Sequence, residues 1–431
     1  MYANDDLKAM VKPDRVHRRL YVDREIFDLE MERIFGRAWV FVGHESQVPE
    51  PDDFVTTRIG KQPLLITRDR AGEVHVMFNR CGHRGVKLCA EAEGNKPGFR
   101  CPYHGWAYRT NGKLAGIPYR EGYSKEFLAE KELDLARPAR VGAYRGFIFV
   151  SLAKEGMSLD DYLGPIKRSI DDLCDRAPDG EILAQAGCNR YIVRANWKMQ
   201  MDNGVDLYHA PFAHHSTLDE DGRQFSRHGG GPSFYKEGTK NPVDFDPMGV
   251  HGFDNGHGYQ GAVPQVPDPD GKAFKELRAM LVERHGEERT REILTYDRFN
   301  SMIYPNLTFQ AMGQHFRVVM PIDVDRTEVR IYPVLFKGAP EEWNRDAVRS
   351  VAATHSPASM IQTDDVAVFE RAQEGLQADG ADWVMFARHI GAEIPNNVGG
   401  QGAPGSSEFV LRRQYNEVWL RYMTGEQEAA A

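Results

Sequence analysis

The sequence has few cysteines, no long apolar run and no excess of positive charge. Its five cysteines in 431 residues are an odd and low number, which excludes a disulfide framework of the secreted kind. No stretch approaches the roughly 18–20 consecutive apolar residues of a membrane-spanning helix. The formal net charge of -9 disfavours nucleic acid and anionic membranes as partners, because both select basic surfaces.

The N-terminus also lacks the apolar segment of a signal peptide, since residues 1–11 carry several charges. Together with the missing membrane span, this predicts a cytoplasmic protein. The length predicts two or three domains, at roughly 100–200 residues each. In a reducing compartment, cysteines close to histidines are more often metal ligands than disulfide partners.

The hydrophobic pattern changes twice along the chain and predicts an α+β protein. Residues 40–153 contain short runs rich in β-branched and aromatic side chains, separated by turn signals, which indicates a small antiparallel β domain. Elsewhere the apolar positions recur mainly at helical spacing. The expected elements are helices over residues 23–39, 159–174, 272–294 and 348–377, a strand leading into a helix over 187–199, and two strands over 316–336 joined at 323–326.

A stretch rich in glycine, proline and aspartate, residues 227–274, follows in the second half of the chain. A loop of this length inside a compact domain is usually functional or mobile. We expect it to form part of a lid over a binding pocket.

Two cysteine–histidine pairs lie within the expected β domain. Cys81 and His83 are followed, after seventeen residues, by Cys101 and His104. Each loop offers one thiolate and one imidazole, which is the ligand set of a Rieske [2Fe–2S] cluster with two cysteines on one iron and two histidines on the other. Trp106 follows the second loop and is expected to cover the site.

Structural zinc is the alternative reading of these four residues. Zinc fingers usually group their cysteines in one pair and their histidines in the other, whereas each loop here mixes the two. A third possibility is a protein that only carries electrons on the cluster. Small Rieske carriers, however, need only about a quarter of this length, so the remaining residues call for a second function.

Acids and histidines recur between residues 202 and 215. Asp206 and His209 are three apart and would share one face of a helix. His209 and His214 are five apart, and Pro211 between them would kink the helix so that both rings converge. Two histidines and one carboxylate form the facial triad that holds ferrous iron and leaves positions open for O₂.

The carboxylate of this triad has to come from elsewhere in the chain, and Asp364-Asp365 is the best candidate. Alternatives stay open for each residue taken alone. His215 could replace His214 as the ligand, the acids near His209 could be a polar helix face, and paired aspartates are often solvated. The cluster motif upstream favours the iron site, because a redox cluster needs an acceptor for its electrons.

The two motifs, in this order, resemble those of the large (α) subunits of Rieske non-haem iron aromatic ring-hydroxylating dioxygenases of the terephthalate, salicylate and benzoate types. The likeness runs from about residue 22 to residue 423, and includes Asn196-Trp197-Lys198. It implies that Asp365 is the third iron ligand. Relatives often have glutamate where this chain has Asp202, a difference that concerns pocket shape and not the iron.

The resemblance implies a Rieske antiparallel β domain (residues 39–155) and a helix-grip catalytic domain, an antiparallel sheet with helices (residues 156–431). Residues 1–38 would be a helical part of the catalytic domain. It further implies one [2Fe–2S] cluster and one Fe²⁺ per subunit. The subunits would form a homotrimer, α₃ or α₃β₃ where a small β subunit is present.

The same resemblance implies a route for electrons. NADH would supply them through a reductase, with or without a ferredoxin, to the cluster. Asp206 would bridge His104 of the partner subunit to His209, and a carboxylate that fixes a ligand histidine is physically reasonable. Asp202, Asn203 and Leu207 would line the substrate pocket.

The expected reaction adds both atoms of O₂ to adjacent ring carbons and gives a cis-dihydrodiol, as in aromatic hydrocarbon catabolism. The preferred substrate is an aromatic carboxylic acid of the substituted benzoate class. Alternatives are a Rieske monooxygenase, for ring monohydroxylation or O-demethylation, and a dioxygenase of neutral or polycyclic arenes. Arg317 or Arg388 could bind a carboxylate, although a surface position is expected for both.

Overall fold

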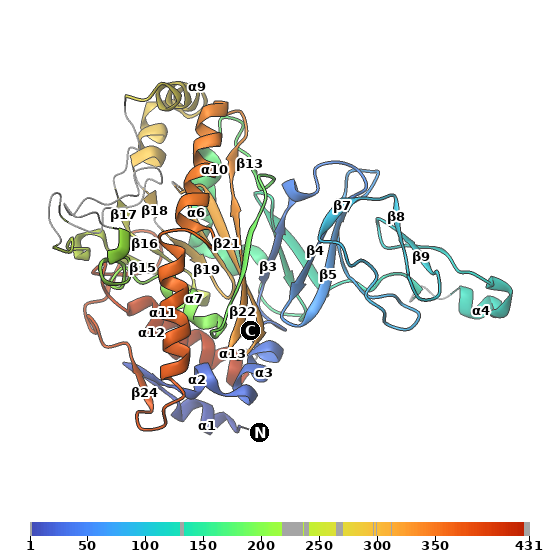
Figure 1. Cartoon of the computed structure of the whole chain (residues 1–431), viewed down its shortest axis with the longest axis horizontal. Helices are drawn as coiled ribbons and strands as arrows, with labels where there is room; N and C mark the ends of the chain where they lie inside the picture. The colour runs from blue at the N-terminus through green and yellow to red at the C-terminus, as the bar shows by residue number, and fades with distance from the viewer. Residues whose placement is uncertain are drawn as a thin grey trace. The chain divides into compact units, whose positions relative to one another are not determined.

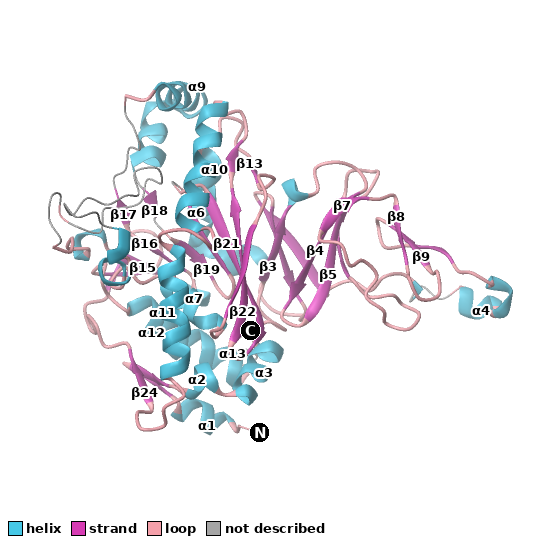
Figure 2. Ribbon diagram, viewed as in Figure 1, coloured by secondary structure: helices cyan, strands magenta, loops and turns pink. Residues whose placement is uncertain are grey.

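The structure is a computed structural model that describes residues 2–129, 133–217, 236, 241–263, 270–295, 297–298, 300–311 and 313–425. The chain divides into two compact units. Residues 35–159 form the smaller unit, and residues 1–34 with 160–431 form the larger one. Figure 1 and Figure 2 show the elements of each. The larger unit is therefore assembled from segments that flank the smaller unit in the sequence.

The smaller unit is built from antiparallel strands, as the sequence predicts. The strands form one four-stranded sheet in the order β6-β5-β4-β7 and two three-stranded sheets, β10-β9-β8 and β11-β12-β3. Its elements are β3 (Val40–His44), β4 (Asp53–Ile59), β5 (Gln62–Arg68), β6 (Val74–Phe78), β7 (Glu93–Asn95), β8 (Gly98–Arg100), β9 (Ala107–Arg109), β10 (Leu114–Gly116), α4 (Lys125–Leu128), β11 (Arg140–Tyr144) and β12 (Phe147–Ser151).

A nine-stranded antiparallel sheet is the centre of the larger unit, in the order β14-β22-β21-β20-β19-β16-β15-β26-β25. Its strands are β14 (Asn189–Val193), β15 (Val250–Gly252), β16 (Gly258–Gln260), β19 (Ser301–Ile303), β20 (Leu307–Gln310), β21 (His315–Asp323), β22 (Arg326–Pro333), β25 (Ile394–Pro395) and β26 (Gln401–Ala403). Smaller sheets pair β1 (Val11–Lys12), β2 (Arg15–His17) and β24 (Trp383–Met385), then β13 (Ile182–Leu183) with β23 (Leu335–Phe336), and β17 (Ala262–Val263) with β18 (Asp297–Arg298).

Helices accompany this sheet, and α7 packs against β21 while α11 packs against α8 and β14. They are α1 (Asn4–Ala9), α2 (Arg19–Val22), α3 (Arg24–Arg33), α5 (Leu159–Leu163), α6 (Lys167–Asp175), α7 (Trp197–Asn203), α8 (Ala210–Ala213), α9 (Lys272–Thr295), α10 (Glu341–His355), α11 (Gln362–Gly375), α12 (Phe409–Arg413) and α13 (Leu420–Thr424). A π-helical segment, Gln414–Trp419, joins the last two. Among the described residues, no helix combines the length and the apolar character needed to cross a lipid bilayer.

Several expected elements are confirmed. The strand and helix over residues 187–199 are β14 and α7, and the two strands over 316–336 are β21 and β22. The single helix expected over 272–294 is only partly right, because α9 is broken at Gly286, where the backbone has a non-helical φ of 78°. Much of the glycine- and proline-rich stretch 227–274 lies outside the described residues, so its role as a lid stays a prediction.

Three further expected helices are shorter or divided. The helix over residues 23–39 ends at Arg33, where the chain leaves the larger unit for the smaller one. The helix over 159–174 is interrupted at Gly164, which has a φ of 48°, and at the following Pro165, which cannot donate a backbone hydrogen bond. The helix over 348–377 is two helices, α10 and α11, because Pro357 disfavours helical geometry at the residue before it.

The carboxylate of Glu30, on α3, is fully buried and links three parts of the larger unit. It accepts hydrogen bonds from the indole N–H of Trp197 at 2.9 Å and of Trp419 at 2.8 Å. Lys198 Nζ donates to both of its oxygens, at 2.7 and 2.8 Å. Burial lowers the pKa of Lys198 while the charge of Glu30 opposes that shift. Glu30 therefore fixes the start of α7, which leads to the iron motif.

Replacing Glu30 with alanine is expected to lower the free energy of unfolding of the larger unit by about 3–5 kcal/mol, because it leaves the Lys198 ammonium buried without its partner. Denaturant unfolding followed by tryptophan fluorescence measures this, since Trp197 and Trp419 both contact Glu30. Glu32→Ala, at an exposed position of the same helix, is the matched control and should change stability by less than about 0.5 kcal/mol. Equal stability of the two variants would contradict the role given to Glu30.

Candidate active site: two metal-binding groups of residues

The four residues of the cysteine–histidine motif lie in two loops of the smaller unit. Cys81 and His83 follow β6, and Cys101 and His104 lie between β8 and β9. The loops share one hydrogen-bonding pattern. In the first, Gly85 N–H donates to Cys81 O at 3.0 Å and Cys81 N–H donates to Val86 O at 2.8 Å.

In the second loop, Gly105 N–H donates to Cys101 O at 3.1 Å and Cys101 N–H donates to Trp106 O at 2.7 Å. The turn glycines have φ values of 75° and 74°, a left-handed conformation that glycine adopts without strain. The two loops therefore have the same backbone turn, and each loop carries one thiol and one imidazole.

The donors in these loops fit a [2Fe–2S] cluster. The Cys81 and Cys101 thiols are buried and are not joined in a disulfide. The Nδ1 atoms of His83 and His104 are buried and have no hydrogen-bond partner among the described residues, while the two rings lie 4.6 Å apart. Buried polar nitrogens without partners are costly unless a ligand satisfies them, and a cluster iron would do so.

Aromatic side chains enclose this site. The Trp106 ring stacks on His83 with centroids 4.9 Å apart and planes at 6°, as expected from the sequence. Tyr108 lies on the cysteine side, where its hydroxyl accepts from Gly82 N–H at 3.0 Å and lies 3.5 Å from Cys81 Sγ. Burial, together with the Cys81 thiol, raises the pKa of Tyr108. The thiols are therefore held in dry surroundings, and the histidines lie nearer the surface.

The chain around the second motif is not one helix. α7 ends at Asn203, so Asp206 and His209 do not share a helix face as the sequence reading predicted. The Asp206 carboxylate instead accepts from the backbone N–H of Tyr208 at 2.7 Å and of His209 at 3.3 Å. Pro211 lies in the first turn of α8, where its missing N–H is not needed, and therefore begins a helix instead of kinking one.

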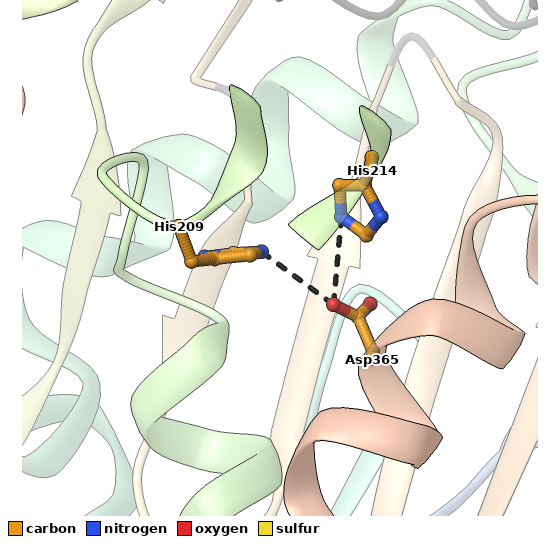
Figure 3. Close-up of side chains that lie close together, drawn as sticks. All are labelled: His209, His214 and Asp365. Atoms are coloured by element: carbon orange, nitrogen blue, oxygen red, sulfur yellow. Dashed lines mark ion pairs between the residues drawn. The ribbon is translucent and has the colours of Figure 1, made fainter. Parts of the chain in front are cut away.

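His209, His214 and Asp365 nevertheless converge, as Figure 3 shows. Asp365 Oδ1 lies 3.5 Å from His209 Nε2 and 3.4 Å from His214 Nε2. The three ligand atoms all lie within 4.8 Å of one another. His214 is 2% exposed and Asp365 is 5% exposed, whereas the neighbouring His215 is exposed to solvent. The geometry therefore favours His214 over His215, and Asp365 over Asp364, as a ligand.

The far nitrogen of each ligand histidine faces a second carboxylate. His209 Nδ1 lies 3.3 Å from Asp206 Oδ2, and His214 Nδ1 lies 3.6 Å from Asp364 Oδ2. The negative charge of a carboxylate on this side of the ring favours a proton at Nδ1, which leaves Nε2 for a metal. The donor set is thus that of a 2-His-1-carboxylate iron site, and the residues present fit Fe²⁺.

The electrostatics of the group also favour a cation. Burial disfavours the charged imidazolium, yet the carboxylates of Asp206 and Asp365 raise the pKa of His209 to about 10. Burial also disfavours the Asp365 carboxylate, but the hydrogen bond with His209 and the charges of His214, His209 and Arg317 outweigh it and lower the pKa of Asp365. A metal ion binding here would displace the proton from His209.

Two further side chains, those of Asn203 and Gln260, contact the iron-binding residues or the backbone beside them. The sequence did not predict a positioning role for either. The Asn203 amide, predicted to line the pocket, lies 2.9 Å from His209 Nε2 and donates to Asp365 Oδ1 at 3.2 Å. The Gln260 side-chain amide is oriented so that its oxygen faces the backbone N–H donors of the iron motif. This oxygen accepts from the N–H of Asp206 at 3.0 Å and of Leu207 at 3.3 Å. Gln260 sits on β16 with no local signal in the sequence.

The other expected pocket residues lie close to the iron motif. Asp202 accepts hydrogen bonds from the hydroxyls of Tyr21 at 2.8 Å and Tyr415 at 3.0 Å, and burial raises the pKa of Asp202 to about 7. Leu207 packs in a small apolar cluster with Ala210 and Phe245. Their contact with substrate stays a prediction.

Comparison with known proteins identifies two family domains in the chain. Residues 38–130 match the Rieske [2Fe-2S] domain, and residues 167–425 match the catalytic domain of the ring hydroxylating alpha subunit. The chain belongs to the ring-hydroxylating dioxygenase α-subunit family. It is an oxidoreductase with a Rieske [2Fe–2S] domain and a non-haem iron catalytic domain, and such α subunits are oxygenase components that work with a reductase and oligomerise.

Individual relatives cover most of this α subunit. The toluate 1,2-dioxygenase α subunit of Pseudomonas putida is 35% identical over 89% of this chain and 86% of its own length. An N,N-dimethyl phenylurea N-demethylase α subunit of a Sphingobium species is 30% identical over 81% of this chain and 78% of its own. A naphthalene 1,2-dioxygenase with indole bound in its active site has a TM-score of 0.84 and 26% identity, over 100% of this chain and 97% of that one.

Proposed function

We propose that this α subunit dihydroxylates an aromatic carboxylic acid of the substituted benzoate class, with O₂ and with electrons from NADH delivered by a reductase, and releases a cis-dihydrodiol. The convergence of His209, His214 and Asp365 in a chain that also has a Rieske domain carries the proposal. The similarity to a toluate dioxygenase supports the substrate class. Toluates are benzoates with a ring methyl group.

Each ligand has one role in this proposal. Cys81, His83, Cys101 and His104 hold the [2Fe–2S] cluster, and His209, His214 and Asp365 hold Fe²⁺. The cluster supplies single electrons, and the ferrous ion supplies open coordination positions at which O₂ is activated. Asn203 orients Asp365 by donating to its Oδ1, and the charge of Asp206 favours a proton at His209 Nδ1.

In this proposal, separate parts of the chain take up the electrons and bind the substrate. Residues 39–155 receive the electrons, and residues 1–38 with 156–431 bind the substrate and the iron. Asp206 transmits electrons between subunits by bridging His104 of the partner subunit to His209, within a homotrimer of α subunits to which a small β subunit can be added. The hydrogen bonds from the backbone of Tyr208 and His209 to the Asp206 carboxylate support this, because they hold it beside the ligand ring.

A single turnover tests the reaction and the substrate class together. The purified protein would be reduced chemically, exposed to ¹⁸O₂ with benzoates or with neutral arenes, and the products analysed by mass spectrometry. We expect two labelled oxygens on the ring of a benzoate. Double labelling of neutral arenes alone would keep the chemistry and overturn the substrate class.

One labelled oxygen would instead move the enzyme to monooxygenation. This second candidate has a specific observation in its favour, since one relative is an N-demethylase of a dimethyl phenylurea. The metal ligands are expected to be the same in both reactions, so the label count is the deciding measurement.

A further inference from the structure

Arg317 lies on β21, in the interior of the nine-stranded sheet, and is only 4% exposed. The surface position expected from the sequence is therefore wrong for this residue, whereas Arg388 is exposed. Arg317 Nε is buried without a hydrogen-bond partner, and the guanidinium has no ion pair, within the part of the chain that the structure describes. By contrast, the buried Arg412 pairs with Glu393 and donates to backbone carbonyls.

The side of the sheet that carries Arg317 faces the iron site. Arg317 is directly opposite Thr308 on β20, so the two side chains share one face. Thr308 packs against Gly204, because its methyl carbon lies only 3.0 Å from the position that a Cβ atom on Gly204 would occupy. Gly204 directly follows Asn203, whose amide contacts His209 and Asp365.

Other polar atoms without partners accompany Arg317. His315, two residues earlier on the same face, packs on His355 with ring centroids 4.2 Å apart, and its Nε2 is buried without a partner among the described residues. The Thr308 hydroxyl and both side-chain amide atoms of Gln362 are also buried without a hydrogen-bond partner among the described residues. Gln362 lies on α11, one helical turn before Asp365. Buried polar atoms are normally satisfied by protein groups, by ordered water or by a ligand, and within the described part of the chain these atoms lack the first kind of partner on the side of the sheet that faces the iron site.

We propose that Arg317 binds the carboxylate of the aromatic substrate, with the Thr308 hydroxyl as a further donor, and so selects anionic over neutral arenes. The inference rests on the proposed function and adds the residue that determines specificity. A guanidinium suits this role because its fork of N–H donors matches the two oxygens of a carboxylate. Arg317 and Asp365 form no ion pair in the described part of the structure, and Asp365 Oδ1 is directed at His209 and His214.

Comparison of benzoate with benzamide, its neutral isostere, tests the proposal in the single-turnover assay. The concentration dependence of product formation gives an apparent dissociation constant for each substrate. In Arg317→Gln we expect benzoate to bind roughly 10- to 100-fold more weakly, as for loss of charge-assisted hydrogen bonds, while benzamide changes by less than about threefold. Arg317→Lys should fall between, because it keeps the charge and loses the fork.

Arg388→Gln is the matched control, since it removes an exposed guanidinium that stacks 4.2 Å over Tyr208. Its preference for benzoate should equal that of the wild type. Iron content is measured for every variant. Should Arg317→Gln fail to fold or to hold iron, Thr308→Val tests the same pocket without removing the buried charge, and should weaken benzoate alone by several-fold.

Two results would overturn the inference. Equal weakening of benzoate and benzamide at full iron content would make Arg317 a positioning residue for Asp365, and unchanged benzoate binding would remove any role in recognition. Failure of the proposed function looks different, because the wild type itself would then give no labelled product from benzoate before any variant is made.

Discussion

The His209→Ala variant should keep the colour of the Rieske cluster, lose the mononuclear iron and lose turnover. Removing one imidazole leaves two of the three protein ligands, His214 and Asp365, which cannot hold Fe²⁺ firmly. Loss of an outer partner alone typically costs 10–100-fold in metal affinity or activity, so loss of a ligand should cost at least about a hundredfold. Visible absorbance reports the cluster, and iron and sulfide analysis reports the stoichiometry, with roughly three irons to two sulfides expected in the wild type and two to two in the variant.

His215→Ala is the control for this experiment. It removes a histidine from the same segment, but one that is exposed and outside the group formed by His209, His214 and Asp365. The iron content and turnover of His215→Ala should stay within about twofold of the wild-type values, because substitutions at exposed positions usually have small effects. Iron loss in His215→Ala with iron retained in His214→Ala would reverse the ligand assignment.

Asp206→Asn is expected to retain both metals and to slow the transfer of electrons between them by about a hundredfold or more. The substitution keeps the size of the side chain and an oxygen that can accept from Tyr208 and His209 N–H, but it removes the negative charge 3.3 Å from His209 Nδ1. Stopped-flow absorbance of the reduced protein, mixed with substrate and O₂, measures the reoxidation of the cluster. The cluster should stay reduced for far longer in the variant.

Asp364→Asn is the control for Asp206→Asn. It shows whether slow electron transfer comes from loss of a specific route through Asp206 or from neutralising any carboxylate next to an iron-binding histidine. Asp364 Oδ2 lies 3.6 Å from His214 Nδ1, whereas Asp206 Oδ2 lies 3.3 Å from His209 Nδ1, and Asp364 also accepts from the Ser216 hydroxyl at 2.6 Å. We expect Asp364→Asn to reoxidise its cluster at nearly the wild-type rate. Equal slowing in both variants would leave Asp206 with a positioning role, and a normal rate in Asp206→Asn would rule out the bridge.

The sequence was sufficient where the chemistry lies in short contiguous segments. Cys81 to His104 span two adjacent loops, and the spacing alone indicated a cluster. The α+β class could also be predicted, because β-branched runs and helical periodicity occupy different parts of the chain. The division of residues 348–377 into α10 and α11 was also visible in principle, since Pro357 is a local signal that weighs against one continuous helix.

The sequence was insufficient where contacts join distant segments. Asp365 is far along the chain from His209, and only a family resemblance assigned it to the iron. The helical reading of Asp206 and His209 assumed that α7 continues, whereas it ends at Asn203. The burial of Arg317 depends on the nine-stranded sheet, so no pattern in its neighbourhood distinguishes it from an exposed arginine.

The Glu30 carboxylate has a consequence for how the chain can be shortened. It ties α3, near one end, to Trp419, close to the other, and Asn4 Nδ2 adds a hydrogen bond to the carbonyl of Thr424 at 2.9 Å. Deleting α13 together with Trp419 would therefore strip Glu30 of a donor and loosen the helix that leads to the iron. A C-terminal deletion that extends into α13 and removes Trp419 is therefore expected to lower the iron content.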